Sequence, residues 1–443
     1  MDSSTVSTGA APIDIAALID HQPVSRFQIH VLLLCSAVLF IDGFDTQAIG
    51  YVAPEIAREW QLGRGALGPV FSAGLLGLMI GALVLGPVAD RVGRKKIIVF
   101  SSIAFGVGTL ATIFVHDMAW LIAVRFVTGL GLGGAMPNAV ALTSEFSPHR
   151  RRATMVMAMF CGFSVGAALG GIIAAWLIPL YGWRAVFVVG GVAPLLYAPF
   201  LAKYLPESIR YLALSGRHDP KLRDLLQGLA PQIFLDSNTR FVVNEPRLPG
   251  IPIAHLFREG RTLTTLMFWV IFFTSLLDLY LLSNWLPTVL NDLGASISVA
   301  ALVGAMLQIG GVVGTFTLGS FIDRFSFKAL AMTYLLAAVA VAAVGYSSHS
   351  IAVATLAIFC AGFCIVGGQI ASNALTATYY PTAIRSTGVG WALGIGRAGS
   401  IVGPLVGGVM MANHVSTQTL FLTAAVPALI ACAAALVLGR TAK

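Results

Sequence analysis

Twelve long apolar stretches constrain the fold of this chain more than any other feature. A helix that spans a bilayer needs about 20 mostly apolar residues. Charged residues make up 10% of the chain, against about 25% in soluble domains. The sequence therefore predicts an all-α membrane protein with twelve transmembrane helices. The expected spans are 27–50, 65–88, 97–115, 119–140, 153–178, 184–205, 263–288, 297–320, 329–346, 350–378, 389–412 and 418–438.

One long polar segment, 206–262, divides the twelve expected spans into six and six. This division predicts an N-terminal six-helix bundle over 27–205 and a C-terminal six-helix bundle over 263–438. Two short tails, 1–26 and 439–443, flank the bundles. Each bundle then has an even number of crossings, so the two tails and the central segment are expected on the same side of the membrane.

Basic residues are distributed very unequally between the two sides. Only Arg58, Arg64 and Arg184 fall in loops on the side opposite the termini, and Arg125 and Arg397 fall inside spans. The remaining Lys and Arg residues lie with the termini and the central segment, and such loops are cytoplasmic in most membrane proteins. We therefore expect both termini in the cytoplasm. This asymmetry also explains the net charge of +8 without a nucleic-acid partner.

The two halves of the chain repeat one another at matching spacing. Three echoes recur in the same order, which predicts two bundles with the same connectivity and orientation. Such parallel repeats build transporters that bind substrate at the bilayer midplane between the bundles. The echoed residues are Gly86, Asp90 and Arg91 with Gly319, Asp323 and Arg324; Pro148, Arg152, Thr154 and Gly170 with Pro381, Arg385, Thr387 and Gly403; and Asp45 and Pro54 with Asp278 and Pro287.

Two aspartates, Asp42 and Asp45, lie within the first span, three residues apart on one helix face. Carboxylates at membrane depth are costly unless they are protonated, paired or facing water, and they usually mark ion or proton pathways. Counting from the expected end of the span places both in the outer half of the bundle, level with Arg125. The arrangement suits proton uptake and release; a fixed Asp–Arg bridge that braces two helices is the alternative.

Arg397 lies within the eleventh span, where its planar guanidinium would match a substrate carboxylate. Pairing with an acid from a neighbouring helix is the alternative, but Asp278 is expected at a different depth. We expect Asp278 to line the cavity instead. Gln308 and Asn373 are further substrate-site candidates, although interhelical hydrogen bonds explain such amides equally well. Trp391 could stack on an aromatic ring, with core packing as the alternative.

The sequence resembles the major facilitator superfamily over its whole length. The stretch from Gly86 to Lys96 resembles the superfamily's motif between helices 2 and 3, and Arg125 opens a stretch similar to its helix 4 motif. Pro206-Glu-Ser-Ile-Arg210 resembles a segment found after helix 6 in several subfamilies. Asp42-Gly-Phe-Asp45, followed by Gly50 and Ala53-Pro54, resembles the aromatic acid:proton symporters. The resemblance implies that both aspartates are needed for transport.

The resemblance also assigns the loop motif to a cytoplasmic gate that locks the outward-open state and breaks in each cycle. Glycine permits the tight turn in this loop, while its charged residues can bond helix ends and charges across the cytoplasmic face. Glu145, at the end of the fourth span, is the expected latch partner, and the repeat supplies a degenerate second copy. The expected gate residues are Gly86, Asp90, Arg91, Gly93, Arg94, Glu145, Asp323, Arg324 and Arg385.

The function expected from the sequence is proton-coupled uptake of a hydroxybenzoate-type aromatic carboxylate across the bacterial inner membrane. The expected partners are the acid, protons and the lipid bilayer, and the chain is expected to act as a monomer without metal or cofactor. No nucleophile, base or metal set indicates an enzyme. The rivals are a transporter of another small organic acid or a sugar, a drug:proton exporter, and a membrane sensor of aromatic acids.

Overall fold

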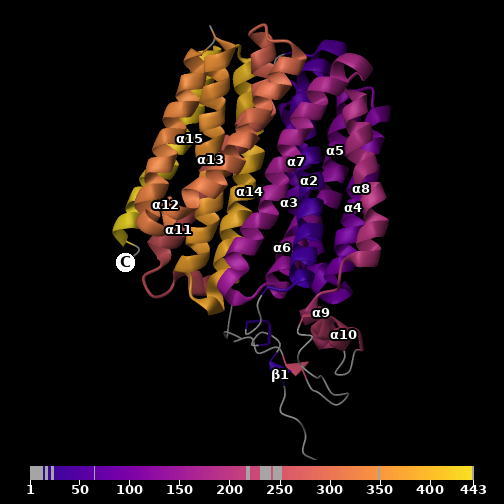
Figure 1. Ribbon diagram of the computed structural model, residues 1–443. Coiled ribbons are helices and arrows are strands. Elements are labelled where there is room, and N and C mark those ends of the chain that lie inside the picture. Colours follow the sequence, from indigo (N-terminus) through magenta and orange to yellow (C-terminus); the bar gives the residue numbers. More distant parts are fainter. Residues whose placement is uncertain are drawn as a thin grey trace, which may run out of the picture.

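The computed structural model describes residues 13–14, 18–20, 24–63, 65–215, 220–229, 241–242, 252–347 and 350–441. Within these residues, 12 helical segments are long and apolar enough to cross a membrane. This confirms the predicted all-α architecture with twelve spans. The helices form two bundles that stand side by side, with the first half of the chain in one and the second half in the other (Figure 1).

The first six spans form the N-terminal bundle. Its fourth span, Met118–Phe146, is built from two helices joined by a turn at Gly133 and Gly134, and its third span ends in a short 3₁₀ turn. The elements are α2 (Arg26–Glu59), α3 (Gly68–Val92), α4 (Arg94–Ala111), η1 (Thr112–Phe114), α5 (Met118–Leu132), α6 (Ala135–Phe146), η2 (His149–Arg151), α7 (Arg152–Tyr181) and α8 (Arg184–Tyr204).

The last six spans form the C-terminal bundle. α12 consists of two helices that meet at a kink at Ser326, where φ is 46°, and it contains the two spans Ile297–Gly319 and Arg324–Tyr346. The elements are α11 (Thr262–Asp292), α12 (Ile297–Tyr346), α13 (Ile351–Tyr379), α14 (Thr382–Ala412) and α15 (Thr417–Thr441).

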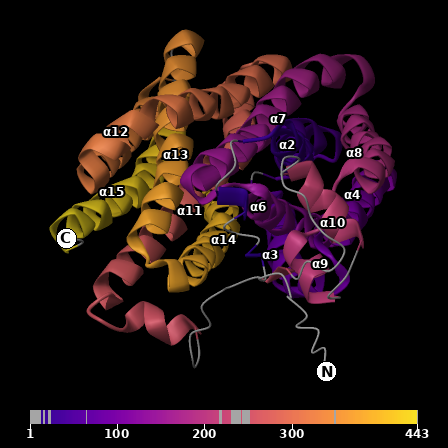
Figure 2. The same ribbon diagram turned by 60° about the horizontal axis from the view of Figure 1, so that its bottom comes forward.

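Short elements outside the two bundles lie at one end of the molecule, below the helices in Figure 1 and facing the viewer in Figure 2. They are α9 (Ile209–Ser215), α10 (Pro220–Leu229), η3 (Pro252–Phe257) and a two-residue parallel pairing of β1 (Ile13–Asp14) with β2 (Phe241–Val242). We name this end of the bundles the loop end and the opposite end the distal end. Arg64, one of the residues used to predict the orientation, lies outside the described residues.

Hydrogen bonds from side chains define where several spans begin. Ser25 and Gln28 form a reciprocal capping box at the start of α2, which satisfies two backbone N–H groups that the first turn leaves unpaired. Asp117 caps α5, and Ser296 caps α12 in the same way. These polar residues explain why the spans start close to their predicted positions.

The predicted end of the first span is wrong by about two turns. α2 continues through Pro54 and ends at Glu59, whereas the sequence predicted an end at residue 50. Proline is tolerated inside membrane helices because neighbouring groups satisfy the freed carbonyl. α14 begins at Thr382, and the candidate span within it, Thr387–Ala412, agrees with the predicted span to within two residues.

The internal repeat extends to individual packing contacts. A Cβ atom on Gly77 would overlap the carbonyl of Phe126, and one on Gly310 would overlap the carbonyl of Phe359. Gly310 follows Gly77, and Phe359 follows Phe126, by the same number of residues that separates Asp278 from Asp45. Several other glycine contacts recur at this shift: Gly81 with Leu130 and Gly314 with Phe363, Gly129 with Gly74 and Gly362 with Leu307, and Gly166 with Phe40 and Gly399 with Phe273. The two bundles therefore share one residue register.

The bundles contact each other toward the distal end. Oγ of Ser72 on α3 donates to the carbonyl of Ile401 on α14 at 2.8 Å, and Phe71 packs edge-on against Trp285. On the other side of the interface, Oγ of Ser298 on α12 donates to the carbonyl of Ala175 on α7 at 2.8 Å. The distal end of the interface between the bundles is therefore closed in this conformation.

Candidate functional site

Asp45 forms a buried ion pair within the N-terminal bundle. Its Oδ2 lies 3.4 Å from Nη2 of Arg125 on α5, and its Oδ1 accepts a hydrogen bond of 2.6 Å from Oγ1 of Thr109 on α4. The guanidinium also faces the ring of Phe187 on α8 at 5.7 Å, a favourable cation–π geometry. Both oxygens of Asp45 are therefore engaged, and the carboxylate links three helices of one bundle.

Asp42 is also fully buried, but its environment differs from that of Asp45. Oδ1 of Asp42 accepts a hydrogen bond of 3.0 Å from Thr46, one turn along α2. Its Oδ2 is buried without a hydrogen-bond partner. The charge of Arg397, on α14 of the other bundle, acts on Asp42 across the interface. Asp42 thus has a free oxygen and an opposite charge facing it from the second bundle.

Arg397 contacts both bundles. Its Nη1 donates to the hydroxyl of Tyr280 on α11 at 3.3 Å, and its Nη2 donates to the sulfur of Met136 on α6 at 2.9 Å. Neither partner is a carboxylate, so the guanidinium keeps a net positive charge at the interface. A half-buried arginine with only a phenol and a thioether as partners is suited to binding a planar anion.

A small cavity lies between Asp45 and the second bundle. Its volume is about 20 Å³, enough for one water molecule. Asp45, Thr46 and Arg125 line it from the N-terminal bundle, and Asn284 lines it from α11 of the C-terminal bundle. The ion pair therefore borders the interface between the bundles instead of being enclosed by one bundle alone.

The buried charges lie near the middle of their helices. With α2 ending at Glu59, Asp42 and Asp45 are about 26 and 21 Å from its distal end at 1.5 Å per residue. On the same scale, Arg397 is about 22 Å from the start of α14. Both helices extend beyond the expected spans, so these residues are further from the helix ends than the spans imply. Their depth in the bilayer stays a prediction.

The remaining substrate-site candidates are dispersed within the C-terminal bundle. Nε2 of Gln308 on α12 donates to Ser283 on α11 at 3.4 Å, and Oδ1 of Asn373 on α13 is buried without a partner. Trp391 is 44% exposed and stacks on Trp269, with ring centroids 5.9 Å apart. Among the described residues, none of these side chains contacts Arg397, so the structure does not gather them into one site with it.

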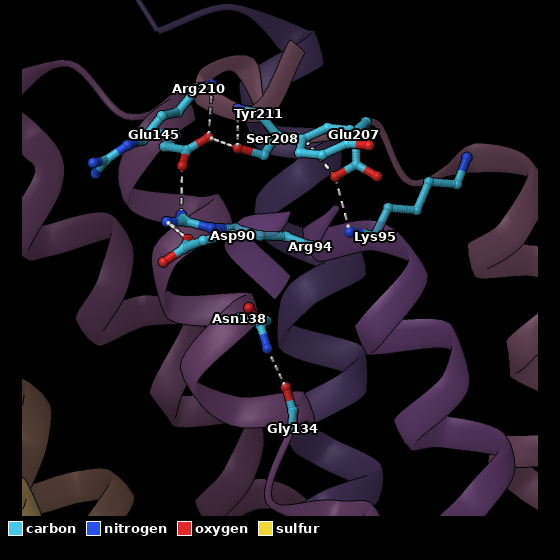
Figure 3. A network of polar contacts seen from close by, with 10 residues as sticks. All are labelled: Asp90, Arg94, Lys95, Gly134, Asn138, Glu145, Glu207, Ser208, Arg210 and Tyr211. Atoms are coloured by element: carbon cyan, nitrogen blue, oxygen red, sulfur yellow. Dashed lines mark hydrogen bonds and ion pairs between the residues drawn. The ribbon is translucent and has the colours of Figure 1, made fainter. Parts of the chain in front are cut away.

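A network of polar contacts covers the loop end of the N-terminal bundle (Figure 3). Nη1 of Arg94 lies 2.5 Å from Oε1 of Glu145, and Nη2 lies 3.3 Å from Oδ1 of Asp90. Oε2 of Glu145 accepts a hydrogen bond of 2.7 Å from the Ser208 hydroxyl, just before α9. The predicted partners Arg94 and Glu145 are therefore in contact, and they bind the segment that follows the bundle.

Glu207 adds a second link in this network. Its Oε1 accepts a hydrogen bond of 3.1 Å from the backbone N–H of Lys95, in the first turn of α4, where a negative charge is favourable. Gly93, with a φ of 112°, separates α3 from α4, and a Cβ there would overlap the Glu207 carboxylate. The positive φ therefore favours glycine at this position, and a larger residue would also displace the Glu207 carboxylate.

The other expected gate residues make fewer contacts in this conformation. Arg91 is exposed, and a Cβ on Gly86 would meet no atom within 4 Å. In the second copy, Arg324 lies over the ring of Phe325, and Nε of Arg385 donates to the carbonyl of Tyr380 at 3.4 Å. The side chain of Asp323 lies outside the described residues.

Sequence reasoning missed several partners of these charges. Thr109, Met136 and Ser208 each contact a predicted residue from another element, but a single threonine, methionine or serine carries no signal in a sequence. Tyr280 is one of many aromatic residues in the spans, so the sequence alone does not single it out. Glu207 could have been found, because it is the acidic residue of the segment that resembles a superfamily motif.

Two repeated six-helix bundles, with buried charges near the middle of helices at their interface, are typical of a membrane transporter. The chain belongs to the Major Facilitator Superfamily, whose family model matches residues 35–287 and 268–443. Together these matches cover most of the chain, and the sequence resemblance to this superfamily is confirmed. The protein is therefore a multi-pass membrane transporter and not an enzyme.

Curated relatives named as transporters of aromatic acids align with almost the whole chain. The "4-hydroxybenzoate transporter PcaK" of Pseudomonas putida is 41% identical over 441 residues, covering 99% of this chain and 98% of the relative. The "Gallate transporter" of the same species is 40% identical, covering 97% and 96%. The "3-(3-hydroxy-phenyl)propionate transporter" of Escherichia coli is 37% identical, covering 87% of each chain.

Solved structures support the fold. A bacterial homologue of the human lysosomal transporter Spinster, described as inward-facing and unoccupied, superposes with a TM-score of 0.71. The alignment covers 95% of this chain and 98% of the other, at 19% sequence identity. This similarity concerns the arrangement of the helices alone.

Proposed function

We propose that this protein takes up an aromatic carboxylate together with protons by alternating access between two bundles. The observation that carries the proposal is the position of Arg397, whose guanidinium contacts both bundles and whose charge acts on Asp42, a carboxylate with one unpartnered oxygen. The names of the relatives all refer to transport of aromatic acids, which favours the same substrate class for this chain.

In this proposal Arg397 binds the substrate carboxylate. The guanidinium can form two parallel hydrogen bonds with a carboxylate, and such charge-assisted bonds are stronger than those to a phenol or a thioether. The substrate would displace Met136 or Tyr280 as a partner of Arg397. Both of these side chains offer a surface to an aromatic ring, because a thioether and a phenol pack favourably against one.

The two aspartates have different roles in this proposal. Asp45 is held by Arg125 and Thr109, so it is the structural member of the pair. Asp42 is the proton carrier, because its free Oδ2 can accept a proton and its charge competes with the substrate for Arg397. Protonation of Asp42 releases Arg397 to bind the substrate carboxylate. Proton and substrate binding are thereby linked through a single guanidinium.

The energetics favour such a link. Bringing a monoanion into a cell against an inside-negative potential costs about 2.3 kcal/mol per 100 mV. A proton carried with the acid cancels its charge. The orientation that we propose places the loop end in the cytoplasm, since basic residues gather there. The closed distal end then corresponds to a conformation that opens toward the cytoplasm.

We also propose a cytoplasmic gate at the loop end. We assign the loop-end network of Arg94, Glu145 and Ser208 to the cytoplasmic gate, because it joins the loop motif to the segment that leads to the second bundle. Arg91 and Gly86, which are uncovered in this conformation, would meet the C-terminal bundle when the loop end closes. A single chain carries all of these residues, so we propose that the monomer transports.

Competition during uptake tests the substrate class. Cells that express the protein are given radiolabelled 4-hydroxybenzoate with an excess of gallate, 3-hydroxybenzoate, glucose, succinate or a lipophilic cation. We expect the aromatic acids alone to compete. Competition by glucose or succinate would support a transporter of another class, and export of the cation would support a drug exporter. Cells carrying the empty vector provide the background.

A further inference from the structure

Asp278 on α11 is the C-terminal counterpart of Asp45. The shared residue register of the two bundles aligns these aspartates, and it aligns Ser275 with Asp42. The C-terminal bundle therefore keeps one carboxylate of the pair and replaces the other by a hydroxyl. Asp278 is 1% exposed, as buried as Asp45. The two carboxylates therefore occupy equivalent, equally buried positions in their bundles.

Asp278 has lost the cation that holds its counterpart. In the N-terminal bundle, Arg125 directly precedes Phe126, whose carbonyl packs against Gly77. At the matching place on α13, Ile358 directly precedes Phe359, whose carbonyl packs against Gly310. An apolar side chain therefore occupies the position of the guanidinium. The register also matches Thr109, the hydroxyl partner of Asp45, with an alanine, Ala342.

The charged groups of neighbouring helices do not compensate Asp278. α13 carries no charged residue, and Arg397 on α14 and Asp42 on α2 act on Tyr280 instead. Among the described residues, Tyr334 on α12 is the titratable side chain that interacts electrostatically with Asp278. Within the described part of the chain, no ion pair reaches Asp278, and its Oδ1 has no hydrogen-bond partner. An isolated carboxylate this deep in a membrane is strongly disfavoured in its ionised form.

Several other buried polar atoms lie on the loop-end side of Asp278. The hydroxyl of Tyr334 contacts that of Ser372 on α13 at 3.1 Å, and Ser275, one turn before Asp278, has an unpartnered Oγ. On the α13 face that carries Ser372, both polar atoms of Gln369 are also buried without a partner. We name these groups the polar path, because each can form a hydrogen bond with a water molecule on the loop-end side of Asp278.

We propose that Asp278 is a second proton-binding site, housed in the C-terminal bundle and serving the same transport cycle. The inference rests on the proton-coupled uptake proposed above and adds one proton to each acid carried. A proton binds one oxygen of the Asp278 carboxylate, and in each cycle that O–H bond breaks and the proton leaves through the polar path to water at the loop end. No oxidant or reductant takes part.

The proposal makes transport of a monoanion electrogenic. With one proton per substrate molecule, the transported charge is zero and the membrane potential drives nothing. With a second proton on Asp278, each cycle carries one positive charge inward. A potential of 100 mV, worth about 2.3 kcal/mol per charge, then supports about 50-fold accumulation even without a pH gradient.

Proteoliposomes test this directly. Uptake of 4-hydroxybenzoate is measured at equal pH on both sides, with a potassium diffusion potential that is negative inside. We expect the wild type to accumulate the acid and Asp278→Asn to accumulate none, although the variant still responds to a pH gradient. Thr333→Ala, another buried polar change in this bundle, is the matched control and should keep the response to potential, because among the described residues the Thr333 hydroxyl bonds only the carbonyl of Ala329 in its own helix.

The outcomes separate this inference from the proposed function. A wild type that responds to a pH gradient but not to potential overturns the second site and leaves one-proton symport standing. An Asp278→Asn variant that keeps the potential response also overturns it. A wild type that responds to neither gradient overturns proton coupling itself.

A measurement on the wild type removes any dependence on how the variant folds. A hydrophobic carbodiimide reacts with protonated carboxyl groups in apolar surroundings. Mass spectrometry of the labelled wild-type protein should find the adduct on the peptide that contains Asp278, with less labelling as the pH rises. Absence of the adduct at every pH, while other buried carboxyls are labelled, overturns the proposal.

Discussion

Asp45 and Arg125 form a buried ion pair, with 3.4 Å between Oδ2 and Nη2, whereas Asp42, one turn away, forms no ion pair with the described residues of its own bundle. Two carboxylates that look equivalent in the sequence are therefore different in the structure. One joins helices of a single bundle, and the other faces an arginine of the second bundle.

Replacing Asp42 with Asn should uncouple substrate binding from pH. In the wild type, ionised Asp42 competes with the substrate for Arg397, so affinity for the acid should fall as the pH rises. Asn resembles the protonated carboxyl, so the variant should bind at all pH values with the affinity of the wild type at low pH. Binding measured on purified protein across a pH series tests this, and exchange of labelled for unlabelled substrate should persist. A variant with the wild-type pH dependence would exclude Asp42 as the carrier.

Replacing either member of the Asp45–Arg125 pair should destabilise the protein. Removing one partner of a buried pair leaves an uncompensated charge, which costs about 3–5 kcal/mol. Thermal unfolding in detergent is measured for Asp45→Asn, Arg125→Met and the double variant. We expect the double variant to be more stable than the sum of the two single losses predicts. Additive effects would show that the ion pair contributes no coupling energy.

Replacing Arg397 with Lys should raise the apparent KM for the aromatic acid. Lysine keeps the charge but cannot form two parallel hydrogen bonds to a carboxylate. A lost charge-assisted bond costs about 1.5–3 kcal/mol, so we expect KM to rise by about 10- to 100-fold. Arg184→Lys, at the distal end, is the matched control, because Arg184 pairs with Glu59 far from the bundle midplane. Equal KM values for the wild type and Arg397→Lys would argue against direct contact.

Gly77 and Gly86, on the same helix, should respond differently to alanine. A Cβ on Gly77 would overlap the Phe126 carbonyl, and such overpacking costs about 1–3 kcal/mol. A Cβ on Gly86 meets open space, and alanine in a helix is favoured over glycine by about 0.5–1 kcal/mol. We expect Gly86→Ala to keep its thermal stability but to transport more slowly, because the loop end must close around this position. Normal transport by Gly86→Ala would remove this residue from the gate.

Much of the fold could be predicted from the sequence because lipid imposes simple rules. A span must be long and apolar, basic residues mark one side, and a repeat in the sequence implies a repeat in the structure. Helix ends were less predictable, since Pro54 lies inside α2 and the helix continues to Glu59. Those ends decide where a residue lies along its helix, so Asp42 and Arg397 are further from the helix ends than the expected spans imply.

The site was only partly predictable, because partners from different helices leave no joint signal in one sequence. Asp45, Arg125 and Arg397 stood out as charges in apolar spans. Which aspartate meets which arginine depends on helix rotation and packing, and these follow from glycine contacts throughout the bundles. The isolation of Asp278 became visible only when the register of the bundles placed Ile358 where Arg125 would be.

Proton-driven accumulation of the substrate by the purified protein tests the central claim most directly. Proteoliposomes containing the wild type are given radiolabelled 4-hydroxybenzoate under an inward proton gradient, with and without a protonophore. Protein-free liposomes correct for the acid that diffuses through the lipid. We predict accumulation above the equilibrium level that the protonophore abolishes. Protein-dependent accumulation that persists in the presence of the protonophore, or none in its absence, would contradict the account.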